Sequence, residues 1–140
     1  MLLNYLDTLN NEKRIVLASG SSMRKKILEQ VGLTNFVISP SGFAEDLPKS
    51  DFATSIDYVI KTSEVKLHEK ARELKDQVAA GAPKTDILIA ADTIVSFEDR
   101  EVIEKAADAQ HAFDMLKSHI ERGSHQVYTS VWIAFLNEET

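Results

Sequence analysis

The segment from Asp86 to Val95 constrains the fold more than any other part of the chain. It reads D-I-L-I-A-A-D-T-I-V, with turn-forming residues before it and charged residues after it. A short run that is apolar on both alternating faces is typical of a strand buried on both sides of a sheet. Asp92 lies in the middle of this run. An ionised carboxylate in such a place costs free energy unless it is hydrogen-bonded, holds a metal or opens onto a cleft.

Two interpretations of Asp92 stay open at this point. In the first, Asp92 ends the strand and caps a turn together with Thr93. In the second, Asp92 is a functional carboxylate that the strand holds in a cleft. The local pattern alone does not separate the two interpretations.

The composition predicts one cytoplasmic domain. The 140 residues are enough for one core and too few for two, so we expect a single domain over 1–140. The chain has no cysteine, which excludes a disulfide framework, a thiolate zinc site and a cysteine nucleophile. No segment approaches the ~20 apolar residues of a membrane span, and the start is not signal-like. The net charge of -6 argues against a nucleic-acid polymer as partner.

Strands and helices alternate along the chain. Residues 1–13 have helix-like apolar spacing and predict a short helix or a mobile arm. The other expected helices are 23–31, about 52–79 and 108–122, and the expected strands are 15–18, 36–39, 86–95, 102–103 and 126–134. A hairpin turn is expected at 98–100. This order predicts an α/β domain with a mixed, twisted sheet flanked by helices.

The expected helix at 108–122 has an apolar stripe. Asp108 can cap its start, and Arg122 with Gly123 ends it. Its apolar residues recur at helical spacing, so we expect them on the inner side of the helix: Ala109, Ala112, Phe113, Leu116 and Ile120.

A hydroxyl-rich loop joins the first strand to the helix that follows it. Ser19 and Ser21 can supply hydroxyl groups, and Arg24 in the first helical turn can supply charge. Together with the backbone N–H groups of a helix start, such groups form a pocket for phosphate. The alternative is a simple N-cap at Ser21 or Ser22. Neither a Walker loop nor a G-x-G-x-x-G stretch occurs in the chain.

An acidic pair and one lysine stand out among the charged residues elsewhere in the chain. Glu45 and Asp46 form an acidic pair, which is usually solvated but also suits Mg²⁺. Lys66 falls at the flank of the apolar stripe of the long helix, where the commoner explanation is a snorkelling lysine. The other lysines of this helix are expected to be solvated charges: Lys61, Lys70 and Lys75.

Three stretches, in this order, carry a resemblance to one family. The motif L-A-S-G-S-S-M-R begins at Leu17, A-A-D-T-I-V begins at Ala90, and E-K-A-A-D-A-Q-H-A-F-D-M-L is followed by H-Q-V-Y-T-S-V from His125. Together they resemble the Maf family of nucleoside triphosphate pyrophosphatases. Glu45 and Lys66 fall at about the intervals that the family shows.

The resemblance implies a Maf and inosine triphosphatase-like α/β fold with a cleft. It also implies hydrolysis of a nucleoside triphosphate to a monophosphate and pyrophosphate, assisted by Mg²⁺ or Mn²⁺. Carried onto this chain, the phosphate-binding residues are Ser19, Ser21 and Arg24. Glu45 and Asp92 would hold the metal or its water, and Asp92 would be the general base that activates this water.

Two lysines and three further residues complete the implied site. Lys66 and Lys105 would neutralise phosphate charge in the transition state. The residues implied at the part of the site that selects the nucleobase are Thr93, Ser22 and Met23.

The chain departs from the family pattern at several places. Ser22 stands where many members have proline, Met23 where they have arginine or tryptophan, and Ala106 where proline follows the family lysine. The A-G-x-Y-x-x-Q-G stretch of the family does not occur before Thr140, so we expect a domain shortened at its C-terminus.

Two functional hypotheses follow from the resemblance. The first is a house-cleaning enzyme that removes non-standard or surplus nucleotides and favours dTTP and UTP. The second is a catalytically impaired nucleotide-binding or interaction protein. A haloacid-dehalogenase type phosphatase is disfavoured, because that chemistry uses D-x-D and Asp92 is followed by Thr93 and Ile94. The apolar terminal strand with Trp132 and Phe135 would suit a homodimer contact.

Overall fold

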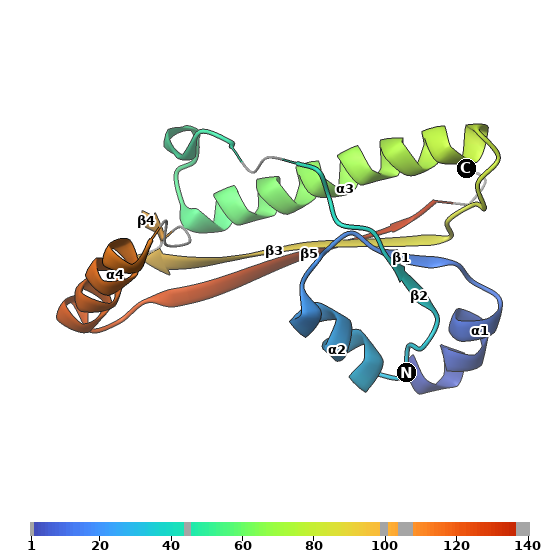
Figure 1. Ribbon diagram of the computed structural model, residues 1–140, viewed down its shortest axis with the longest axis horizontal. Helices are drawn as coiled ribbons and strands as arrows, with labels where there is room; N and C mark the ends of the chain where they lie inside the picture. Colours follow the sequence, from blue (N-terminus) through green and yellow to red (C-terminus); the bar gives the residue numbers. More distant parts are fainter. Residues whose placement is uncertain (1, 44–45, 99–100, 104–107, 137–140) are drawn as a thin grey trace. The chain divides into compact units, whose positions relative to one another are not determined.

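The computed structural model describes residues 2–43, 46–98, 101–103 and 108–136 (Figure 1). The chain forms two units, which are described separately. The first unit comprises residues 1–45, 63–91 and 131–140, and the second comprises 46–62 and 92–130. Three of the four boundaries between the units therefore fall inside α3 (Ser55–Ala79), β3 (Ile87–Phe97) and β5 (Gln126–Phe135).

The first unit is built on a parallel sheet with β1 (Ile15–Leu17) in the middle. Val16 lies opposite Val37 of β2 (Phe36–Ile38) on one side and opposite Leu88 of β3 on the other. All three residues of β1 are buried, as the continuous apolar run predicts for a central parallel strand. The expected strands at 15–18, 36–39 and 86–95 are confirmed.

Helix α3 covers one face of this sheet through alternate strand residues. Val16, Leu88 and Ala90 point to the same side and form a core with Leu67 and Leu74 of α3. Ala71, Trp132 and Ala134 pack against this core. β5 pairs with β3, and its residues alternate strictly between half-buried and exposed. The helix and the two strands thus converge on one apolar layer.

The N-terminal segment forms η1 (Leu2–Tyr5) and α1 (Leu6–Asn11). Asn10 ties α1 to the turn after α2 (Ser22–Gln30): its Nδ2 donates to Gly32 O over 3.0 Å, and its Oδ1 accepts from Thr34 N over 2.8 Å. Gly32 has φ +101, and an added Cβ would lie 2.7 Å from Leu6 Cδ1. The left-handed turn therefore favours glycine, and any larger residue would also displace the end of the Leu6 side chain.

The long helix begins three residues later than the sequence pattern suggests. Phe52 has extended backbone angles, and α3 starts at Ser55 after Thr54, whose Oγ1 accepts from Asp57 N over 3.2 Å. The side-chain cap stops the helix from reaching back to Phe52. The end of α3 at Ala79 agrees with the prediction.

The second unit contains η2 (Lys49–Asp51), an antiparallel hairpin and α4 (Ala109–Arg122). Ser96 of β3 lies opposite Val102 of β4 (Glu101–Ile103), which confirms the expected returning strand. Asp99 and Arg100 of the expected turn lie outside the described residues. A core of Tyr58, Val59 and Ile94 holds the unit together. Leu47, Phe52, Val102 and Tyr128 pack against this core.

The predicted orientation of α4 is wrong. Phe113, Leu116 and Ile120 are 61%, 63% and 80% exposed, so the apolar stripe faces outward rather than inward, while Ala112 is half-buried and Ala109 exposed. The contacts of the opposite side set this rotation: His119 stacks edge-on against Phe97, and the Arg122 guanidinium lies 4.2 Å from the centre of the Phe97 ring. Helical spacing identified the stripe but not the surface that α4 packs against.

Within the described residues, no helix combines the length and the apolar character needed to cross a bilayer.

Candidate functional site

The turn between β1 and α2 brings Ser19, Ser21 and Arg24 together. Arg24 Nη1 donates to Ser19 Oγ over 2.9 Å, and the Ser21 backbone N–H donates to the same oxygen over 3.2 Å. Ser21 is also the N-cap of α2, because its Oγ accepts from Arg24 N over 3.3 Å. The capping interpretation is therefore confirmed for Ser21, and it coexists with a cation held over the turn.

This turn has the physical properties of an anion site. It lies at the carboxyl end of a parallel strand and at the N-terminus of α2, where backbone N–H groups and the helix dipole favour negative charge. Ser19 is buried and the Arg24 guanidinium is half-buried. Ser22 and Met23, in the first turn of α2, are exposed.

Two lysines of α3 are buried in the first unit. Lys66 is 7% exposed, so its ammonium group does not extend freely into water as a snorkelling lysine would. Lys70 is 3% exposed, which contradicts the prediction that it is a solvated charge; Lys61 and Lys75 are exposed as predicted. The four-residue spacing places Lys66 and Lys70 on the same face of the helix.

Asp92 lies inside β3 and belongs to the second unit. The strand continues past it to Phe97, so the interpretation of Asp92 as a residue that ends the strand is wrong. Asp92 as a whole residue is 7% exposed. Thr93 points to the other face, is exposed, and its Oγ1 lies 2.9 Å from Thr129 Oγ1 on β5. Burial of an acid within a strand calls for a partner or a function.

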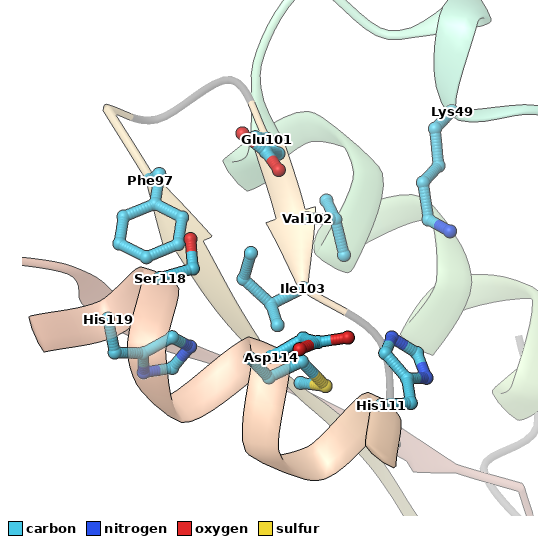
Figure 2. Close-up of a pocket in the computed structure, with 10 residues that line it drawn as sticks. Lys49, Phe97, Glu101, Val102, Ile103, His111, Asp114, Ser118 and His119 are labelled. Carbon is cyan, nitrogen blue, oxygen red and sulfur yellow. The ribbon is translucent and has the colours of Figure 1, made fainter. Parts of the chain in front are cut away.

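The second unit also contains a cavity of about 400 Å³ between the hairpin and α4 (Figure 2). Phe97, Val102 and Ile103 line it from the strands, while α4 presents Asp114, Ser118 and His119 toward them. Arg122 Nη1 forms an ion pair with Glu101 Oε2 over 2.7 Å beside this cavity. None of the described residues predicted for the site lines it.

A family model described as Maf-like protein matches residues 14–140. The chain belongs to the Maf-like family. The match includes the Ser19 to Arg24 turn, Lys66 and Asp92, which are the features that carried the resemblance in the sequence.

Named relatives support this membership. The chain is 40% identical over 121 residues to the dTTP/UTP pyrophosphatase of Schizosaccharomyces pombe, covering 86% of this chain and 48% of that protein. It is 42% identical over 121 residues to a probable bifunctional dTTP/UTP pyrophosphatase/methyltransferase protein of Homo sapiens, and the match covers 86% of this chain and 18% of that protein. It is 36% identical over 140 residues to a nucleoside triphosphate pyrophosphatase of Dictyostelium discoideum, and the match covers 100% of this chain and 61% of that protein. The chain therefore spans less than two thirds of the length of each of these relatives.

The residues expected at a Maf family site divide between the two units. Ser19, Ser21, Ser22, Met23, Arg24 and Lys66 belong to the first unit, and Asp92 and Thr93 belong to the second. Glu45 and Lys105 lie outside the described residues. Within the first unit, the structure joins Ser19, Ser21 and Arg24 by hydrogen bonds.

The described residues fit a hard metal ion through one carboxylate. Asp92 offers buried carboxylate oxygens, the donor type that Mg²⁺ and Mn²⁺ take. No cluster of three or more histidine, aspartate or glutamate side chains suited to a metal occurs among the described residues. Mg²⁺ is commonly held by one or two carboxylates and keeps several waters. Glu45, the second carboxylate that the resemblance implies for a metal, lies outside the described residues.

Sequence reasoning missed Lys70 and its partner Ser39. Lys70 Nζ donates to Ser39 Oγ over 3.0 Å and to Glu73 Oε2 over 2.7 Å. One signal for it was present in the sequence, since Lys70 follows the predicted site residue Lys66 by one helical turn.

Proposed function

We propose that this Maf family chain is a nucleoside triphosphate pyrophosphatase that hydrolyses (d)NTP to (d)NMP and pyrophosphate. The observation that carries the proposal is the Arg24 guanidinium held on Ser19 Oγ at the carboxyl edge of the parallel strands. The relatives named for this activity, at 36% to 42% identity, support it. The resulting role is the removal of non-standard or surplus nucleotides.

The phosphate groups bind, in this proposal, at the start of α2. Ser19, Ser21 and the backbone N–H groups of the first helical turn donate to phosphate oxygens, and Arg24 supplies a fixed positive charge. Lys66 and Lys105 neutralise the charge that develops as the bond to pyrophosphate breaks. Phosphoryl transfer depends mainly on such positioning and charge, which is why this residue set is sufficient.

Asp92 is the proposed general base. A water molecule attacks the α phosphorus, and its proton passes to the Asp92 carboxylate. The bond between the α phosphorus and the oxygen that bridges to the β phosphorus breaks, and pyrophosphate leaves with that oxygen. Glu45 and Asp92 are the proposed metal ligands. Bound Mg²⁺ or Mn²⁺ supplies charge neutralisation and lowers the pKa of water. The position of Asp92 within the buried strand β3 supports the role, because the strand holds this side chain in a fixed place.

The substrate class we propose is dTTP and UTP, which the names of the relatives favour. The residues proposed to contact the nucleobase of the substrate are Thr93, Ser22 and Met23. The homodimer and the cytoplasmic location stay predictions from the sequence.

The test is a panel of canonical and modified nucleoside triphosphates incubated with the chain and Mg²⁺ or Mn²⁺. Separation of monophosphate, diphosphate and pyrophosphate products identifies the bond that is cleaved. Monophosphate with pyrophosphate, formed only with metal and fastest for dTTP or UTP, is the expected result. Absence of turnover in a folded sample that still binds nucleotide would instead support the catalytically impaired nucleotide-binding protein.

A further inference from the structure

Lys70 is the most deeply buried lysine of the described chain, at 3% exposure. A buried ammonium group costs several kcal/mol unless its protons are satisfied. Two of its protons have oxygen partners in the same unit: Ser39 Oγ at 3.0 Å and Glu73 Oε2 at 2.7 Å. Glu73 balances the charge, and the bond to Ser39 ties α3 to the residue that follows β2.

A path of hydrogen bonds continues from Ser39 to the phosphate turn. The Ser39 backbone N–H donates to Leu17 O over 2.9 Å, at the last residue of β1. Two residues further along, Ser19 Oγ accepts from Arg24 Nη1 and from Ser21 N. Lys70 is therefore linked to the exit of β1, and so to the start of the turn, through one side-chain bond and one backbone bond.

A purely structural explanation of Lys70 is unsatisfactory on energetic grounds. A buried ion pair is often no more stabilising than an apolar residue of similar volume, and α3 already buries Leu67 and Leu74 against the sheet. What an apolar side chain cannot supply is a directional bond to Ser39. Catalytic and binding sites depend on such supporting groups, because small displacements of the groups that touch the ligand weaken binding.

We propose that Lys70 is a positioning residue that holds the turn from Ser19 to Arg24 in its phosphate-binding geometry by fixing Ser39. The inference rests on the proposed function, since it assigns phosphate to this turn. Lys70 touches no phosphate in this proposal; its effect passes through Ser39 and the end of β1.

The experiment compares Lys70→Met and Ser39→Ala with the unchanged chain. Ser39→Ala removes the acceptor and leaves the pair between Lys70 and Glu73 in place. Lys75→Met is the matched control, because Lys75 is an exposed lysine of the same helix. The direct measurement is the affinity for inorganic pyrophosphate by titration calorimetry, together with the thermal unfolding midpoint and with KM and kcat for dTTP.

We expect the pyrophosphate Kd and the KM to rise about five-fold or more in Lys70→Met and about three-fold in Ser39→Ala, the size of change that corresponds to loss of one ordinary hydrogen bond. We expect kcat to change less than KM, and Lys75→Met to leave both constants unchanged. If Lys70→Met fails to fold, Ser39→Ala decides the question by itself.

Two negative results are distinguishable. An unchanged pyrophosphate affinity in Ser39→Ala, or in a folded Lys70→Met, overturns the role of Lys70 while the proposed function stands. Failure of the unchanged, folded chain to bind pyrophosphate or nucleotide overturns the proposed function, and the role of Lys70 with it.

Discussion

The guanidinium of Arg24 donates a hydrogen bond to Ser19 Oγ over 2.9 Å and thereby closes the turn that follows β1. The two residues lie five positions apart in the sequence, on either side of the cap of α2. The bond holds a long, flexible cation in one place before any anion arrives. Such preorganisation lowers the entropy that binding would otherwise cost.

Replacement of Arg24 by methionine is expected to lower kcat/KM for the preferred nucleoside triphosphate by about 10- to 150-fold. The estimate corresponds to about 1.5–3 kcal/mol for a hydrogen bond to a charged group. The matched control is Lys25→Met, which removes a half-exposed cation of the same helix that lies 3.8 Å from Glu29. Steady-state kinetics of both variants check the prediction, and equal losses in the two would contradict it.

Substitution of Asp92 by asparagine is expected to lower kcat by about 10²- to 10⁴-fold, the range for loss of a general base. Nucleotide binding should persist in this variant, because the turn from Ser19 to Arg24 belongs to the other unit. Product formation and equilibrium binding of nucleotide are measured on the same sample. If the variant turns over substrate as fast as the unchanged chain does, Asp92 is not the general base.

Ser55 and Ser96 share a buried hydrogen bond of 2.6 Å in the second unit. Each single alanine variant is expected to lower the free energy of unfolding by about 1–3 kcal/mol, because a buried hydroxyl group loses its partner. The double variant should lose less than the sum of the two, since no unpaired hydroxyl remains. Urea denaturation measures this cycle, with the exposed Ser124→Ala as control. Additive losses would show that the two hydroxyl groups act independently.

Ile120 and Ile94 offer a matched test of how α4 is oriented. Ile120 is 80% exposed, so Ile120→Ala is expected to change the free energy of unfolding by no more than about 0.5 kcal/mol. Ile94 lies in the core of the same unit, and Ile94→Ala is expected to cost about 2–5 kcal/mol. Thermal or urea unfolding gives both values. A large decrease in the free energy of unfolding for Ile120→Ala would show that the apolar stripe of α4 faces the interior after all.

The local pattern of the sequence was sufficient for most elements. The apolar run around Leu88 predicted a buried strand, and Ser21 before α2 predicted the cap. These features depend on residues close together in the chain, where backbone preferences and side-chain alternation act directly. The beginning of α3 was placed too early because the apolar spacing extends to Phe52 while the cap at Thr54 does not.

The candidate site was only partly accessible to such reasoning. Ser19 and Arg24 could be paired by their spacing in one turn, and family motifs singled out Lys66 and Asp92. The spacing of one helical turn from Lys66 was the one signal for Lys70, and it did not reveal the burial of Lys70, because its partner Ser39 lies 31 positions away in the sequence. A lysine looks the same in a sequence whether its ammonium group meets water or the hydroxyl group of a distant serine.

The sequence by itself determined the α/β order of the elements, the family, and the residue types available for phosphate chemistry. Only the tertiary structure decided that Lys70 is buried, that Asp92 lies within β3, and that α4 turns Ile120 outward. The physical reason is that periodicity records which residues share a face of one element. Burial depends on what that face meets, and this is set by contacts between residues far apart in the chain.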